Sequence, residues 1–175
     1  VIPLDKATEI FDPSEYLFFV AIGYRDGNRL RERYINEIKE LGYSLYSYID
    51  AQYDSTCCIG ENVVVTATNF IQPMSTIEDG VFVWGNCVIG HHSKLEKCSW
   101  ISPGVQIGGN SAVGARCFVG MGTVINQFVS IGKDSVLGTK VFLNKDHAAE
   151  SVVVEEASSA LDITAKKFWR IGGVR

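Results

Sequence analysis

The chain has 175 residues, of which 46% are hydrophobic and 21% are charged, and these proportions are typical of one or two globular domains. Its formal net charge is −4 at pH 7 and it has no cluster of lysine and arginine, which argues against nucleic acid or an anionic membrane as the main partner. No apolar run reaches the roughly 18 residues of a membrane span, and no signal sequence is recognisable, so we expect a cytoplasmic protein.

Residues 1–52 are expected to form an α/β unit. Residues 16–23 (YLFFVAIG) are a continuous apolar run with the length of a buried strand, and residues 43–49 (YSLYSYI) are again typical of a strand. Between them, apolar residues recur at helical spacing, with Asp26 or Asn28 as a start signal and Gly42 as a stop signal: Leu30, Tyr34, Ile38 and Leu41. This order predicts a βαβ unit whose strands pair in parallel.

A single βαβ unit is small for an independent domain. Parallel sheets are normally covered on both faces, so we expect residues 1–52 to be the remainder of a larger α/β domain, and the absence of an initiating Met agrees with a missing upstream segment. A small packing cap is the alternative interpretation. Gly23, at the C-terminal end of the first predicted strand, is either a glycine that lets a ligand approach the backbone or an ordinary turn glycine.

From residue 57 to residue 146 the sequence repeats in blocks of six without an insertion. The third residue of every block is aliphatic: Ile59, Val65, Ile71, Ile77, Val83, Ile89, Leu95, Ile101, Ile107, Val113, Val119, Ile125, Ile131, Leu137 and Leu143. Three such blocks close a triangular coil, so residues eighteen apart stack on one another and the aliphatic column fills the interior. Residues 53–146 are therefore predicted to form a parallel β-helix of about five coils.

The first residue of each block is small or β-branched almost throughout, which supports the same phase. Cys57, Cys87 and Cys117 occupy this column and are expected to be interior filler. The odd total of 5 cysteines, without a C-x-x-C motif, is typical of a reducing compartment.

Several large apolar residues fall on outward positions of the coils, notably Trp84, Trp100 and Met121. An exposed apolar stripe needs a cover. Neighbouring subunits or a bound cofactor would supply it, and we expect interfaces along the sides of the prism.

Beyond residue 146 the hexad phase is lost. Residues 147–175 are predicted to be a C-terminal cap or tail. They contain a possible closing strand at residues 152–154 and a weakly helical segment at residues 155–170 that would cap the open end of the stack.

The candidate site lies at two adjacent histidines, His91 and His92, which follow Gly90. His91 is expected on the outer surface, where a neutral imidazole can act as a general base near neutral pH. Gly109 lies eighteen residues further on, and a backbone N–H without a side chain in the way is what an oxyanion on an acyl carbonyl needs nearby. A solvated histidine pair beside a turn glycine is the alternative interpretation.

Two other kinds of site were considered, a metal site and a serine nucleophile. His91, His92, His147 and Cys98 are candidate metal ligands, but adjacent side chains on a strand point apart, which disfavours one ion binding both adjacent histidines. Serine nucleophile chemistry is weaker still, because the small-residue column accounts for the many serines. We therefore expect no metal.

The run CVIGHHSKLEKCSWISPG at residues 87–104, continued by VQIGGNSAVGARCFVGMGTVI, resembles the sugar O-acyltransferases of the sialic acid O-acetyltransferase family. It is also similar to the related bacterial nucleotide-sugar N-acetyltransferases, and the resemblance extends over nearly the whole chain, FFVAIG included. It implies a left-handed β-helix, a homotrimer and acetyl-CoA as co-substrate. It also implies a nucleotide sugar or sialic-acid-like sugar as acceptor, acetylated on an amino or a hydroxyl group.

Residue roles follow from the same resemblance. The family's catalytic base falls on His91, and the amide that receives the acyl carbonyl falls on Gly109. A nucleotide-sugar contact falls on Gly23. Further acetyl-CoA contacts fall in the groove between two subunits, on Trp100, Met121 and Thr139.

Three features depart from the family pattern. His92 stands where the family usually has an acidic residue that raises the basicity of the catalytic histidine, and Trp100 replaces a common histidine. The family's first strand and Gly-rich loop would lie upstream of Val1, and the usual terminal Gly-x-Pro-Ala motif is absent. These departures leave an alternative function, a catalytically inactive β-helix that acts as a scaffold or binding protein.

Overall fold

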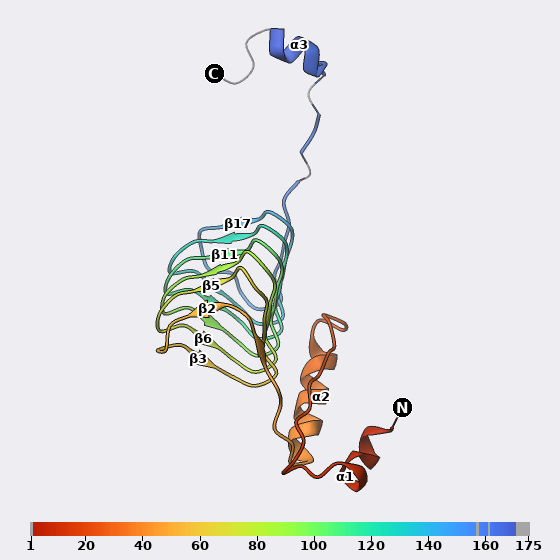
Figure 1. Cartoon of the computed structure of the whole chain (residues 1–175). Coiled ribbons are helices and arrows are strands. Elements are labelled where there is room, and N and C mark those ends of the chain that lie inside the picture. Colours follow the sequence, from red (N-terminus) through yellow and green to blue (C-terminus); the bar gives the residue numbers. More distant parts are fainter. Residues whose placement is uncertain (1, 157, 161, 171–175) are drawn as a thin grey trace.

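The computed structural model describes residues 2–156, 158–160 and 162–170, and its main body is a stack of triangular coils with a helical unit beside it (Figure 1). Short parallel strands form three walls. Sheet I contains β1 (Tyr48–Ile49), β4 (Val64–Val65), β7 (Phe82–Val83), β10 (Trp100–Ile101), β13 (Phe118–Val119), β16 (Val136–Leu137) and β18 (Val152–Val153). Sheet II contains β2 (Gln52–Tyr53), β5 (Phe70–Ile71), β8 (Val88–Ile89), β11 (Gln106–Ile107), β14 (Val124–Ile125) and β17 (Phe142–Leu143). Sheet III contains β3 (Cys58–Ile59), β6 (Thr76–Ile77), β9 (Lys94–Leu95), β12 (Ala112–Val113) and β15 (Ser130–Ile131).

Within the repeats, each strand pairs with the strand eighteen residues away on the same wall. Trp100 of β10, for example, is in register with Phe82 of β7 on one side and with Phe118 of β13 on the other. The predicted fold, a left-handed parallel β-helix, is confirmed. Strand pairing begins at β1 and β2, so the first coil starts inside the segment that we assigned to the α/β unit.

The aliphatic column fills the interior of the stack, as predicted. Every member is buried except Ile59 in the first coil, which is partly buried. The small-residue column also faces inward, and its hydroxyl groups bond to backbone carbonyls; Ser93 Oγ, for example, donates to the Gly108 carbonyl oxygen at 2.9 Å. Cys87 and Cys117 are buried here, and burial raises the pKa of each thiol to about 11.

Three corners join the walls, and the last residue of a corner commonly has a left-handed backbone. We call the corner after sheet II the histidine corner (residues 72–74, 90–92, 108–110 and 126–128). The corner after sheet I is the methionine corner (residues 84–86, 102–104, 120–122 and 138–140). The corner after sheet III is the helix corner (residues 60–62, 78–80, 96–98, 114–116 and 132–134), because the helical unit packs against it.

The helical unit contains η1 (Leu4–Lys6), α1 (Ala7–Ile10) and α2 (Arg29–Glu40). The predicted helix is confirmed: it begins after Asn28 and ends before Gly42, and both residues have a left-handed backbone. Its buried face differs from the predicted one, because Arg31, Ile35 and Ile38 are buried.

The two predicted strands of the βαβ unit are only partly formed. Residues 16–23 and 43–47 meet in one parallel bridge between Phe18 and Leu45, and the second run continues into β1 of sheet I. Residues 16–23 alternate in exposure rather than being buried on both faces: Val20 is buried, whereas Leu17 and Phe19 are exposed. This run, which has the length of a buried strand, is therefore covered on one face only, because an apolar run does not by itself supply the layer that covers its second face.

At the other end, β18 pairs with β16 and forms the expected closing strand. A helix, α3 (Ala165–Arg170), lies in the predicted helical segment, but Figure 1 shows it apart from the last coil, so it does not cap the stack as we expected. Residues 157, 161 and 171–175 of the predicted tail lie outside the described residues. No helix in the described ranges is long and apolar enough to cross a membrane.

Candidate functional site

His91 lies on the histidine corner, directly after β8, and stacks against Gly109 of the following coil. An ideal Cβ on Gly109 would lie 2.6 Å from Nε2 of His91 and 2.7 Å from Cε1. Only a glycine therefore leaves room for the imidazole ring in this position. The structure brings together the two residues that the sequence spacing pairs.

The backbone N–H of Gly109 has no acceptor among the described residues. In the preceding coil, Oε1 of Gln72 accepts a hydrogen bond from the equivalent N–H, that of His91, at 3.0 Å. In the following coil, Oδ1 of Asn126 caps the amide of the next residue at 2.9 Å. Gly109 is preceded by Gly108, which has no side chain for such a cap, so one donor next to His91 stays free.

His92 turns back toward His91. Its backbone φ is 56°, in the left-handed region, and the two Nδ1 atoms lie 3.0 Å apart, with the rings at 89° to one another. The expectation that these adjacent side chains point apart was wrong, because both residues lie on a corner and the left-handed residue reverses the direction of its side chain.

The other residues weighed as metal ligands lie elsewhere. Cys98 is buried at the helix corner against α2, where burial raises the pKa of its thiol to about 11. His147 forms a bridge with Ile131 at the end of sheet III. In the described part of the chain, no group of three or more His, Cys, Asp and Glu side chains could hold a metal ion.

A shallow hollow of about 350 Å³ opens beside His91 on the outer surface of sheet II. It is lined by outward residues of the sheet and by amide side chains of the histidine corner: Val88, Gln106, Val124, Gln72 and Asn126. Its volume is at the small end of the range typical of small-molecule sites. One chain thus offers His91 and Gly109 on an open surface rather than in a closed pocket.

Met121 and Thr139 lie together on the methionine corner, one coil apart, and the Met121 carbonyl accepts a hydrogen bond from the Lys140 N–H at 2.8 Å. Both side chains are exposed. Within one chain this corner is separated from His91 by the full width of sheet II. The structure therefore does not bring the predicted acetyl-CoA contacts to the predicted base of the same chain.

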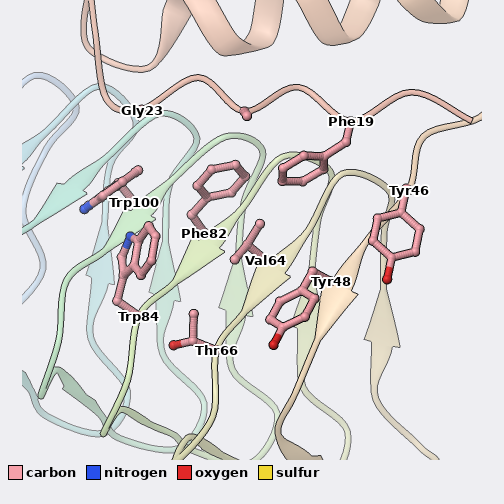
Figure 2. Close-up of a pocket in the computed structure, with 10 residues that line it drawn as sticks. Phe19, Gly23, Tyr46, Tyr48, Val64, Thr66, Phe82, Trp84 and Trp100 are labelled. Carbon is pink, nitrogen blue, oxygen red and sulfur yellow. The ribbon is translucent and has the colours of Figure 1, made fainter.

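Trp100 and Gly23 meet at an aromatic groove of about 500 Å³ on the outer surface of sheet I (Figure 2). An ideal Cβ on Gly23 would lie 3.9 Å from the Trp100 ring, which is an ordinary contact. Figure 2 shows the segment with Phe19 and Gly23 passing over the strands, with the Trp84 and Trp100 rings below Gly23. The ring centroids of Trp84 and Trp100 are 5.3 Å apart. Trp100 thus lies against the predicted sugar contact, Gly23.

Arg31 is a residue of this region that sequence reasoning missed. Its side chain is fully buried, and its guanidinium lies 4.5 Å from the centroid of the Phe82 ring. All five of its N–H groups donate, over 2.6 to 3.1 Å, to neutral acceptors: the carbonyl oxygens of Ile22, Gly23, Gly80 and Cys98, and Oδ1 of Asn28. Burial lowers its pKa to about 10, so it is charged at neutral pH. It fixes the backbone at Gly23, and the polar residue type gave no signal of burial.

Comparison with known proteins was made by sequence and by structure. No family model and no curated protein matches the sequence. Perosamine N-acetyltransferase from Caulobacter crescentus, a histidine-to-asparagine variant in complex with CoA and GDP-perosamine, matches with a TM-score of 0.79 and 26% identity, over 85% of this chain and 70% of that chain. The acetyltransferase domain of PglB from Neisseria gonorrhoeae, in complex with acetyl coenzyme A, matches with a TM-score of 0.79 and 27% identity, over 87% of this chain and 74% of that chain.

Proposed function

With its likeness to the hexapeptide-repeat sugar acetyltransferases confirmed by structure, we propose that this chain is an acetyl-CoA-dependent acetyltransferase. Its acceptor is an amino or hydroxyl group of a nucleotide-linked or sialic-acid-like sugar. One observation carries the proposal: the imidazole of His91 lies against Gly109, whose backbone N–H has no acceptor among the described residues. A base and an oxyanion donor side by side are what acyl transfer requires.

The chemistry follows from these two groups. The sugar amine or hydroxyl attacks the thioester carbonyl carbon, the new C–N or C–O bond forms, and Nε2 of His91 takes the proton of the acceptor. The carbonyl oxygen becomes an oxyanion, to which the Gly109 N–H donates a hydrogen bond. The intermediate then collapses, the C–S bond breaks, and CoA leaves as a thiol with the proton that His91 returns.

The distribution of apolar surface supports the homotrimer. Within residues 57–146, the large apolar side chains that are half exposed or more lie on sheet II and its two corners: Phe70, Phe142, Met74, Phe128 and Met121. Sheet III presents small or polar outward residues instead: Cys58, Thr76, Lys94, Ala112 and Ser130. A trimer with sheet II toward its threefold axis would bury the first set and leave the second in water.

Such a trimer would also complete the site. The histidine corner and the methionine corner border sheet II on opposite sides, so the histidine corner of one subunit would meet the methionine corner of the next. His91 and Gly109 would then share a groove with Met121 and Thr139 of the partner subunit. An exposed thioether and an exposed hydroxyl suit the pantetheine arm of acetyl-CoA, which has both apolar and amide segments.

The sugar is assigned to the region of Gly23 and Trp100. The aromatic groove opens toward the methionine corner through Trp84, which is the first residue of that corner. A sugar placed here would therefore face the histidine corner of the neighbouring subunit. Trp100, proposed as an acetyl-CoA contact, lies between the two ligands in this arrangement.

A CoA-release assay with acetyl-CoA and a panel of nucleotide amino sugars and sialic acids tests the proposal. We expect turnover with one acceptor class, and replacement of His91 by Asn should lower kcat by roughly 10²- to 10⁴-fold, the usual contribution of a positioned general base, with little change in acetyl-CoA affinity. Lys133→Ala, at an exposed position of the helix corner, is the control and should keep its activity. Acetyl-CoA binding without turnover on any acceptor would instead favour the scaffold function.

A further inference from the structure

We propose that His91 and His92 form a one-proton pair, in which Nδ1–H of His91 donates to Nδ1 of His92 and the lone pair of His91 is thereby held on Nε2. The pairing is a property of the free protein. Its value for catalysis rests on the proposed function of His91. In this role His92 is a positioning residue that touches neither the acyl group nor the acceptor.

The distance requires a shared proton. Two Nδ1 atoms 3.0 Å apart are at hydrogen-bond distance, so one nitrogen must carry a hydrogen and the other a lone pair. Two lone pairs would repel one another, and two N–H groups would bring their hydrogens into contact. The neutral pair therefore has two arrangements, which differ in the histidine that donates.

The surroundings of the rings select one arrangement. If His92 donated, His91 would carry its hydrogen on Nε2, which faces Gly109, and only water could accept that hydrogen, because no acceptor for it lies among the described residues. If His91 donates, its Nε2 carries a lone pair, and the remaining N–H of His92 can bond to water because that side chain is exposed. The first arrangement would place two donors, Nε2–H of His91 and the N–H of Gly109, next to one another, whereas the second places a lone pair of Nε2 next to the Gly109 N–H.

In this arrangement neutral His92 replaces part of the function of an acidic partner of His91. An acceptor on Nδ1 fixes the tautomer in which Nε2 is the base, and it also stabilises the imidazolium, because an N–H donated from a charged ring makes a stronger hydrogen bond. His92 supplies both effects without a negative charge.

The corner itself offers matched variants at residue 92. Met74, Asn110 and Phe128 occupy the equivalent position in other coils with the same left-handed backbone, at φ values of 61°, 57° and 60°. His92→Phe therefore keeps an aromatic ring and removes the acceptor, whereas His92→Asn keeps an acceptor oxygen. Both residue types already fit this position in the same protein.

Nitrogen-15 NMR of the histidine rings tests the pair directly, and the chain has only 3 histidines to assign. At a pH where the rings are neutral, we expect His91 to show a protonated Nδ1 and a bare Nε2, with the same pattern in His92→Asn and a loss of that preference in His92→Phe. A protonated Nε2 on His91 in the parent protein would overturn the proposal. So would a tautomer that His92→Phe leaves unchanged.

Kinetics separate this inference from the proposed function. His92→Phe should lower kcat by about tenfold or more with KM nearly unchanged, and His92→Asn should recover most of the loss. Equal kcat values for the two variants would contradict the positioning role. Failure of every variant and of the parent to acetylate any acceptor, with the NMR pattern intact, would refute the proposed function and leave the pair standing.

Discussion

Gly109 combines two requirements at one backbone position. Its missing Cβ makes room for the His91 ring, and its uncapped N–H is available beside the same ring. The spacing of eighteen residues predicts that the two residues stack, because the coil period follows from the hexads alone. The approach of His92 to His91 could not be predicted in that way, since it depends on the left-handed backbone at the end of the corner. The coil geometry imposes this backbone on many residue types, so the residue type at position 92 gives no signal of it.

Gly109→Ala tests this position. The added Cβ would displace the His91 ring, since carbon and nitrogen cannot approach to 2.6 Å, and we expect kcat to fall by roughly 10²-fold or more while the fold persists. Steady-state kinetics, with circular dichroism to check folding, measure both effects. Near-normal turnover in this variant would show that neither the ring position nor the amide matters.

At the scale of elements, α2 is held to the helix corner by charged groups as well as by apolar packing. Arg116 of the corner pairs with Glu32 of α2 and with Asp134 of the next coil, and Arg29 of α2 also reaches Asp134. At the other end of the helix, Lys39 pairs with Asp79. Helical spacing predicted α2 and the burial of Ile38, but not the burial of Arg31, because a rule based on apolar residues does not place an arginine in the interior.

Asp134→Asn tests the charged contacts. Hydrogen bonds from Arg116 hold the pKa of the Asp134 carboxyl below its ordinary value of 3.8. The carboxylate therefore stabilises the fold fully above pH 3.8, and this contribution is lost as the pH falls through the lower, folded pKa. We expect the variant to lose roughly 1 to 3 kcal/mol of unfolding free energy at pH 7 and to show a smaller further loss in acid, as measured by denaturant titration.

Lys133→Ala is the control for that experiment, because Lys133 is the exposed neighbour on the same corner and should be near neutral. An Asp134→Asn variant as stable as Lys133→Ala would show that the ion pairs contribute little to the docking of α2.

At the scale of the whole molecule, the three walls have different outer surfaces around one common core. Sheet II carries the exposed rings of Phe70 and Phe142, sheet III presents small or polar side chains, and sheet I carries the aromatic groove under residues 19–23. The interior of residues 57–146 was predicted from the hexads, whereas Ile49, Ala51 and Val153, which also pack against it, lie outside the hexad phase. The surface pattern was predicted only at single residues, such as Met74, Trp84, Trp100 and Met121, because outward positions carry no periodic constraint.

The core is tested by Ile107→Ala. This side chain is buried in the middle coils, and its truncation should cost about 2 to 5 kcal/mol of unfolding free energy, through lost burial and the cavity that remains. Chemical denaturation of the variant and the parent gives the difference. A loss below about 1 kcal/mol would contradict the assignment of the interior column.

The proposed trimer is tested by Phe128→Glu. Phe128 is 69% exposed on the histidine corner, and a carboxylate there should dissociate the subunits and abolish most acetyl transfer. Sedimentation or light scattering gives the mass, and Cys58→Glu on sheet III is the matched control that should remain trimeric. A parent protein that is monomeric at micromolar concentration would remove the shared groove.

The two ion-paired ends of α2 also relate the length of this helix to the height of the coil stack. From Arg29 to Lys39 the helix rises about 15 Å, at 1.5 Å per residue. The helix corner advances by three coils between Asp79 and Asp134, the partners of its two ends, which is about 14 Å at the usual strand spacing. A relative with one extra coil inserted between Asp79 and Asp134 would keep the interior contacts of the prism. Its α2, however, would be too short by the height of one coil to reach both aspartates. Growth or shortening of the stack without a matching change in α2 is therefore confined to the coils that lie outside this interval.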